Sequence, residues 1–396
     1  MSRDVAPPSP ELTPASAPLL PCQPLFLLAG LWAALVPLVW LLPAGWLPER
    51  GIWHARELLL GMAGAAAGGY LLTSLPAWTK GQLVPLRVTA SAVLLWGLAR
   101  GAGGLELMAV LPAGGSVTGL ANALYFLFVA MAVAVPLARA GVAGRGWIAA
   151  GLMLAAAAGA GLSGFGHGPA AILMLPFTLL LAHVGGRAVP AFTGVWLARI
   201  SAAAPPQPLA PVPLLPVIAA AGLLEWSGWL VAAGWLWLAA AGLVLVRLPS
   251  WKTFRTLGYP ALFWLHIAYA WLPAAFLLQA LAIWRPELSD PASARHALTM
   301  GAMGGMMMAV MLRPAMLRPA MRRHDRRLLM TPLMTAALML VQISALLRVL
   351  AAGIAFDGAV KGAALAWVLG WACFTCAFWP AITGPAPRPA FSARLE

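Results

Sequence analysis

Long apolar runs follow one another along almost the whole of this 396-residue chain. Most are close to 20 residues long, the length that an α-helix needs to cross the hydrocarbon core of a bilayer. Twelve candidate spans occupy residues 25–46, 57–76, 84–100, 116–138, 146–163, 169–189, 211–226, 228–247, 259–284, 296–313, 329–352 and 361–382. The sequence therefore predicts an all-α fold, a polytopic transmembrane helical bundle of about twelve spans.

The composition points to lipid as the main solvent. Hydrophobic residues make up 62% of the chain and charged residues only 9%, whereas soluble domains are about half apolar and a quarter charged. So few charges cannot cover a water-facing surface. No strand-like alternation is present, and helices satisfy their backbone groups inside a bilayer.

The net charge of +14 follows the alternation of the connections. Eighteen of the 25 Lys and Arg residues fall on the side that carries both termini, with the densest cluster between Arg313 and Arg327. Cytoplasmic connections are enriched in Lys and Arg, so we expect a bacterial inner-membrane protein with both termini in the cytoplasm. The charge is assigned to topology and anionic headgroups, with no nucleic acid as partner, because no basic patch is interleaved with aromatic residues.

The ends of the chain differ from its apolar body. We expect a disordered, Pro-rich cytoplasmic tail over residues 1–24, a transmembrane helical domain over 25–382 and a short cytoplasmic tail over 383–396. Acidic residues in the first tail argue against a cleaved signal peptide. Three cysteines are too few for a disulfide framework, and we find no clear internal repeat.

The six histidines are the first candidates for chemistry. By this topology His54, His167 and His296 lie near the outer face, His183 and His266 lie inside spans, and His324 lies in the basic cluster. A neutral imidazole binds haem iron, copper or zinc, so histidines from several helices could converge on one metal. The alternative is a core or interfacial histidine bonded to a neighbouring carbonyl.

Other residue types also leave two interpretations open. Glu57 stands beside His54 and Arg56, where a carboxylate either caps a helix or serves the site. Glu225, inside a span, is expected to be protonated or paired. The methionines from Met300 to Met311 suit either packing or copper(I), and Cys373 and Cys376 either pack as small hydrophobes or bind a metal.

Five segments in order along the chain resemble motifs of the NnrS family. They are Trp53–Gly61, which resembles WHAHEMLFG, followed by Tyr70–Thr79, Gly185–Thr193, Leu265–Trp271 and His296–Gly304. The resemblance extends from about Pro24 to Trp379. It implies a polytopic inner-membrane protein that contains haem and copper and is linked to nitric oxide metabolism or nitrosative stress.

The resemblance also nominates site residues. His54, His266 and His296 stand at histidines of the family motifs and are the expected metal ligands, while Glu57 and Arg187 match further motif positions that would orient ligands or haem propionates. Two departures stand out. Arg56 replaces a motif histidine, and the segment from Arg313 to His324 replaces another histidine-containing motif. If those histidines bind metal in the family, we expect either one cofactor fewer in this chain or a divergent branch with another use.

We therefore expect a haem- and copper-binding membrane protein with nitric oxide as ligand. A small-solute transporter or channel without redox chemistry is the alternative, based on the intramembrane Glu225 and His183. A structural partner of a membrane oxidase or reductase is a third possibility. No Walker loop, dinucleotide fingerprint or nucleophile elbow is present in the sequence.

Overall fold

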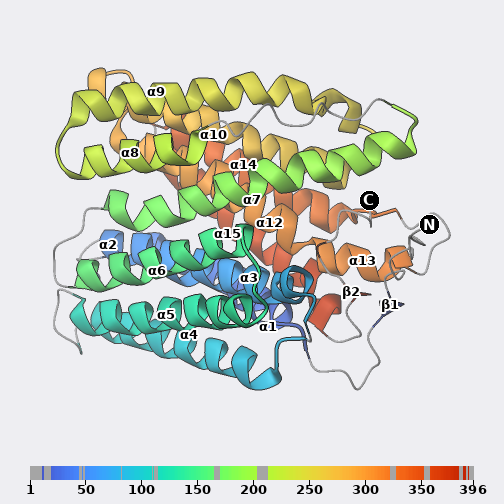
Figure 1. Cartoon of the computed structure of the whole chain (residues 1–396). Helices are drawn as coiled ribbons and strands as arrows, with labels where there is room; N and C mark the ends of the chain where they lie inside the picture. The colour runs from blue at the N-terminus through green and yellow to red at the C-terminus, as the bar shows by residue number, and fades with distance from the viewer. Residues whose placement is uncertain are drawn as a thin grey trace.

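The protein forms a bundle of long, roughly antiparallel helices in a computed structural model (Figure 1). The structure describes residues 11–12, 19–43, 47, 50–81, 83–108, 110, 115–164, 170–202, 213–321, 327–351, 357–382, 387–388 and 391. His167, His324 and most of both predicted tails lie outside these residues. Within them, eleven helices are long and apolar enough to cross a membrane, which confirms the helical bundle.

The first half of the bundle runs from α1 to α7. Its elements are α1 (Cys22–Leu35) with the 3-10 turn η1 (Val36–Leu41), α2 (Arg50–Arg56), the π-helix η2 (Glu57–Ala63), α3 (Gly64–Thr79), α4 (Leu86–Leu107), α5 (Ser116–Arg139), α6 (Arg145–Gly164) and α7 (Ala170–Arg199). Helices α2, η2 and α3 are continuous and make one span. In Figure 1, α4, α5 and α6 form one side of the bundle and α7 runs through the middle.

The second half runs from α8 to α15. It comprises α8 (Leu214–Trp226), α9 (Leu230–Arg247), the 3-10 turns η3 (Leu248–Trp251) and η4 (Thr253–Thr256), α10 (Pro260–Trp284), α11 (Pro291–His296), the π-helix η5 (Ala297–Gly304), α12 (Gly305–Met311), α13 (Arg313–Met321), α14 (Pro332–Leu350) and α15 (Asp357–Ile382). Strands β1 (Glu11–Leu12) and β2 (Pro387–Arg388) pair antiparallel and lie at the α13 end of the bundle (Figure 1).

Two expected spans differ from the observed helices. Helix α8 has 13 residues, about 20 Å, which is shorter than a hydrocarbon core of about 30 Å; residues 203–212 before it lie outside the described part. The sixth span was expected to end at residue 189, but α7 continues to Arg199. Arg187 therefore lies inside a helix and not in a cytoplasmic connection, because apolar residues resume beyond it.

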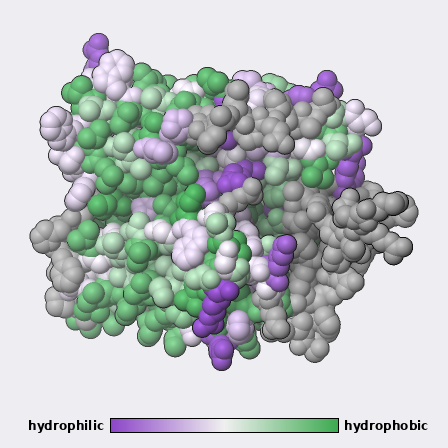
Figure 2. All heavy atoms as spheres, in the orientation of Figure 1, coloured by the Kyte–Doolittle hydropathy of each residue, from purple (hydrophilic) through white to green (hydrophobic). Residues whose placement is uncertain are grey.

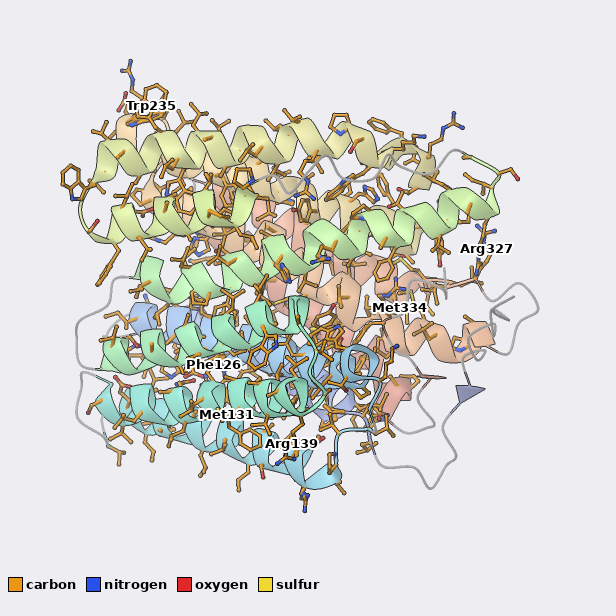
Figure 3. The ribbon with its side chains drawn as sticks, in the orientation of Figure 1. Phe126, Met131, Arg139, Trp235, Arg327 and Met334 are labelled. Carbon is orange, nitrogen blue, oxygen red and sulfur yellow. The ribbon has the colours of Figure 1, made fainter. Side chains whose placement is uncertain are left out.

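The outer surface of the bundle is apolar, as a lipid-facing surface requires. Figure 2 shows hydrophobic side chains over most of one face, with hydrophilic groups mainly toward the two ends and in one patch over α7. Large exposed side chains include Leu94, Leu124 and Val246. Arg139 and Arg327 lie toward the α13 end, and Trp235 lies at the opposite end (Figure 3). We call that opposite end, which carries the turn between α8 and α9, the α8–α9 end.

The spans Arg50–Thr79 and Pro291–Leu317 are the most buried of the eleven candidate membrane spans. Each contains one π-helix, η2 or η5, directly after a histidine-bearing α-helical turn. A π-helix keeps its backbone hydrogen bonds but widens the turn, and such segments are frequent at functional sites. These two spans are the natural place to look for a site.

Glycines let a tryptophan reach each π-helix. A Cβ on Gly61 would lie 2.8 Å from the Trp32 ring of α1, and a Cβ on Gly301 would overlap the Trp271 ring of α10. In both cases the tryptophan comes from the preceding span. The structure thus contains two copies of one unit, a π-helix whose glycine contacts a tryptophan of the preceding span. The sequence shows no clear repeat, because the two copies share helix shape and contacts and few identical residues.

We predict that Gly301→Ala lowers the stability of the protein by about 1–3 kcal/mol, because the added methyl group cannot enter without moving the Trp271 ring. Thermal unfolding in detergent would measure it. Gly97→Ala in α4 is the matched control, since nothing beyond its own stretch of helix lies within 4 Å of an added Cβ there. Equal unfolding midpoints for the two variants would contradict the tight contact.

Candidate functional site

The π-helical units bring two of the three motif histidines to the same end of the bundle. His54 lies in α2, shortly before η2, and His296 is the last residue of α11, directly before η5. Helices α2 and α11 both begin at the α8–α9 end. Arg348, in the last turn of α14, belongs to the electrostatic surroundings of both histidines. This cluster is half-buried, and we call His54, His296 and Arg348 the two-histidine cluster.

His296 is held so that one ring nitrogen is free to bind. Its Nδ1 lies 2.6 Å from the carbonyl oxygen of Ala292, one turn earlier. A carbonyl only accepts, so Nδ1 carries the proton and donates it. The Nε2 lone pair then points away from the helix backbone. Metal-binding histidines have this pattern, in which a carbonyl or carboxylate fixes the other nitrogen.

His54 has the opposite arrangement of its proton. The Trp40 indole Nε1 donates to His54 Nδ1 at 3.2 Å, and the two rings meet edge to face with centroids 5.6 Å apart. An indole N–H only donates, so Nδ1 is the acceptor and the proton of the neutral ring is on Nε2. His54 therefore offers a donor to the cluster where His296 offers a lone pair.

His266 lies elsewhere and is satisfied within the protein. Its position in α10 is about 27 Å of helix from Trp284, at 1.5 Å per residue, so it is far from the α8–α9 end. The Thr193 hydroxyl donates to Val189 O at 2.7 Å and so accepts from His266 Nε2 at 2.8 Å. The Thr253 hydroxyl lies 3.0 Å from Nδ1. Both ring nitrogens are thus occupied.

Glu57 belongs to a buried polar network. Its Oε2 pairs with Arg100 Nη1 at 2.5 Å and accepts from Trp32 Nε1 at 2.7 Å. Arg100 also donates to Asn122 Oδ1, and Asn122 donates to Thr118 O. Glu57 is 1% exposed and Arg100 5%. The helix begins at Arg50, so Glu57 lies two turns inside it and ties α1, η2, α4 and α5 together.

Arg56 and Arg187, the two arginines at motif positions, lie in different parts of the bundle. Arg56, at the position of a motif histidine, pairs with Glu106 at 3.2 Å and donates to Ser163 O at 3.2 Å. Arg187 is exposed on α7, about 18 Å of helix from Arg199. It is therefore not brought to the two-histidine cluster, which lies at the other end of α7.

Glu225 lines a small cavity at the α8–α9 end. Its carboxylate oxygens accept from Gln279 Nε2 at 2.7 Å and Trp237 Nε1 at 2.8 Å, so two neutral donors hold this acid. The cavity, about 40 Å³, is also lined by Thr178 and Arg295. It has room for a few water-sized molecules.

The sulfur-bearing residues do not form a metal site that the geometry identifies. Met303, Met306, Met308 and Met311 are buried in η5 and α12, as packing residues are. Cys22, Cys373 and Cys376 are free. Among the described residues, no group of three or more His, Cys, Asp or Glu side chains is placed to hold a metal ion.

Three contributors to this region were missed in the sequence. In the sequence Trp40 is one of many apolar residues, and Arg100 and Arg348 are single charges at or within apolar runs. The available signal was an arginine within or at the edge of an apolar run, as Arg100 and Arg348 are. Such a charge needs a partner in the bundle.

A family model described as NnrS protein matches residues 19–386, nearly the whole chain. The chain belongs to the NnrS family. This confirms the resemblance carried by the five motifs. No curated protein and no solved structure gives a significant match.

Arg100→Met should destabilise this NnrS-family protein by about 3–5 kcal/mol, because it leaves the buried Glu57 carboxylate without its cation. Thermal unfolding in detergent would measure the loss. Replacing both residues, Glu57→Leu with Arg100→Met, should restore part of it. Glu287→Gln, in the exposed pair with Arg285, is the control, with a cost of about 0–1 kcal/mol. A similar cost for Arg100→Met would contradict the network.

Asp290 caps the helix that carries His296, and the stability that this cap contributes depends on pH. Burial raises the pKa of its carboxyl, but the Ser293 hydroxyl and the N–H groups of Ser293 and Ala292 outweigh burial and hold it below the usual value. The cap therefore stabilises the fold above the unfolded-state pKa, about 3.9, and this contribution is lost as the pH falls through the lower folded-state pKa.

Asp290→Ala should cost about 0.5–2 kcal/mol near neutral pH, as the loss of a helix N-cap does. Asp290→Asn keeps a hydrogen-bond acceptor and should cost less. Its stability should not show the loss at low pH that protonation of Asp290 causes in the wild type. Unfolding in detergent from pH 7 to pH 3 would compare them. Parallel acid profiles for the wild type and Asp290→Asn would exclude a titrating cap.

Proposed function

We propose that this protein binds haem in the inner membrane, with both termini in the cytoplasm, and acts in the response to nitric oxide. Membership of the NnrS family supplies the context. The observation that carries the proposal is the orientation of His296, whose Nδ1 is held by Ala292 O while Nε2 is left with a lone pair. His296 is the residue that would bind the iron.

The donor set favours haem over a metal held by protein side chains alone. A copper or zinc centre needs three or four protein ligands, and no such group of His, Cys, Asp or Glu occurs in the described part of the chain. Haem iron needs only one or two axial ligands, since the porphyrin supplies the rest. The described His, Cys, Asp and Glu side chains identify no copper site, so copper stays a prediction and no step is assigned to it.

Arg348 is the residue best suited to a haem carboxylate. It lies in the surroundings of both outer histidines and of the Asp290 carboxylate, and no carboxylate of the described residues is within ion-pair distance of it. A guanidinium recognises a carboxylate through paired N–H groups. Glu57 and Arg187, nominated from the motifs, are less suited, because Glu57 is occupied by Arg100 and Arg187 lies far along α7. When bound, haem iron would supply a site for nitric oxide or an electron.

The detergent-purified protein should show a Soret band that shifts when nitric oxide is added. His296→Ala should lose most of the haem, whereas His266→Ala should keep it, because both nitrogens of His266 are used inside α10 and its neighbours. Haem content per protein, from absorption, is the measurement. A colourless wild type from haem-supplied cells, or equal haem in both variants, would overturn the assignment.

A second function rests on the cavity beside Glu225. A paired carboxylate, Arg295 and Thr178 around a small volume between membrane helices would suit passage of a small polar solute. Solute flux into proteoliposomes from haem-free protein, lost in Glu225→Leu, would support transport. Flux that is absent in both would exclude it.

A further inference from the structure

The cavity beside Glu225 lies where α7, α8, α9, α10 and the α11–η5 span meet. Glu225 is the residue before Trp226, the last of α8, so the cavity lies close to the α8–α9 end of the bundle. Its volume of about 40 Å³ accommodates a ligand of about three or four non-hydrogen atoms. Neither His54 nor His296 belongs to the lining, so this site does not depend on the proposed haem ligand.

Two opposite charges line the cavity without forming an ion pair. Glu225 and Arg295 are the charged residues of the lining. The donors that hold the Glu225 carboxylate, the Gln279 amide and the Trp237 indole, are both neutral. In the described part of the chain the Arg295 guanidinium enters no hydrogen bond and no ion pair. A permanent cation and a carboxylate thus balance each other around one small volume.

The remaining hydrogen-bonding capacity of the lining has a definite pattern. Each oxygen of Glu225 accepts one bond and keeps a second lone pair. Gln279 uses its N–H2 group on the carboxylate, which leaves its carbonyl oxygen as an acceptor. The Thr178 hydroxyl donates to Met174 O at 2.9 Å, so its oxygen can only accept. The lining therefore offers acceptors at three side chains and donors at Arg295.

We propose that this cavity binds a small neutral amide, which donates N–H to Glu225 and accepts from Arg295 at its carbonyl oxygen. A neutral ligand leaves the two charges of the lining balanced, whereas a bound ion would add an uncompensated charge between membrane helices. An amide also has its donor and its acceptor at opposite ends, as a ligand between two opposite charges needs. This names the solute class of the transport function proposed above, on which it rests for its biological use.

The apolar part of the lining suits the carbon atoms of such a ligand. Met174, Leu175, Phe276 and Leu298 contribute to it, and Phe276 is fully buried, stacked on the Trp237 ring with centroids 5.2 Å apart. The same indole donates to Glu225, so the carboxylate is held by a fixed ring. Polar contacts in such surroundings are stronger than in water, because the local dielectric is low.

Acetamide is the probe, because its methyl protons give one sharp signal and its size fits the cavity. Saturation-transfer difference NMR on the protein in deuterated detergent would detect binding, and a titration would give the dissociation constant. We expect formamide to compete with acetamide. Acetate and methylammonium, which have a similar size but carry a charge, should compete about tenfold more weakly or less, since each adds a charge that the lining does not compensate.

Three variants locate the signal. Arg295→Met should weaken acetamide binding about ten- to a hundredfold, the worth of a hydrogen bond to a charged group, and it breaks no bond of that side chain in the described structure. Ala275→Leu places a larger side chain in the lining and should abolish binding. Arg285→Met, the same change at an exposed position outside the lining, is the matched control. Thermal unfolding would establish that each variant is folded.

Equal acetamide signals from the folded wild type, Arg295→Met and Ala275→Leu would overturn the site, as would a wild type that gives no signal. Stronger binding of acetate or methylammonium than of acetamide would overturn the neutral class. Binding of acetamide in the cavity without flux into proteoliposomes would support the site and exclude the transport function. The haem content of the protein bears on neither result, because the lining contains no proposed haem ligand.

Discussion

Backbone hydrogen bonding in lipid is the constraint on which the rest of this structure depends. No water is present in the hydrocarbon core, so each N–H and C=O must find its partner within its own segment. The chain therefore changes direction and shape without leaving the helix. At Glu57–Ala63 and Ala297–Gly304 it does so by widening α-helix into π-helix, which re-aims side chains while the backbone stays satisfied.

The same constraint governs polar side chains, and it separates three histidines of the same type. His266 is enclosed by two threonine hydroxyls, His54 is fixed by an indole, and His296 is fixed by a carbonyl. Each partner dictates where the imidazole proton lies, and with it which ring nitrogen keeps a lone pair. The partner is one helical turn away for His296 but comes from another helix for His266.

Buried charge follows the same logic in the first half of the bundle. Glu57 and Arg100 neutralise each other, and Trp32 and Asn122 take part of the remaining bonding capacity. In the second half, Trp271 donates to Gln342 at 2.5 Å instead. A charged network beside η2 and a neutral one beside η5 make the two units unequal, although their helices and glycines correspond.

The apolar runs, read alone, determined the fold class and most of the spans, because the width of a bilayer sets the length of a helix and the runs lack strand-like alternation. The motifs determined the family. Neither could determine how the motif residues would meet. Whether α7 stops at residue 189 or at Arg199, and whether Glu57 caps a helix or pairs with Arg100, depends on packing between spans.

The tertiary structure alone decided that His54 and His296 share an end of the bundle while His266 does not, and that Arg348 joins them. Helical periodicity gives the face of one helix, but it gives neither its rotation against its neighbours nor the partner that an imidazole nitrogen meets. Those depend on contacts between residues tens to hundreds of positions apart, such as Thr193 with His266, and only the folded bundle brings them together.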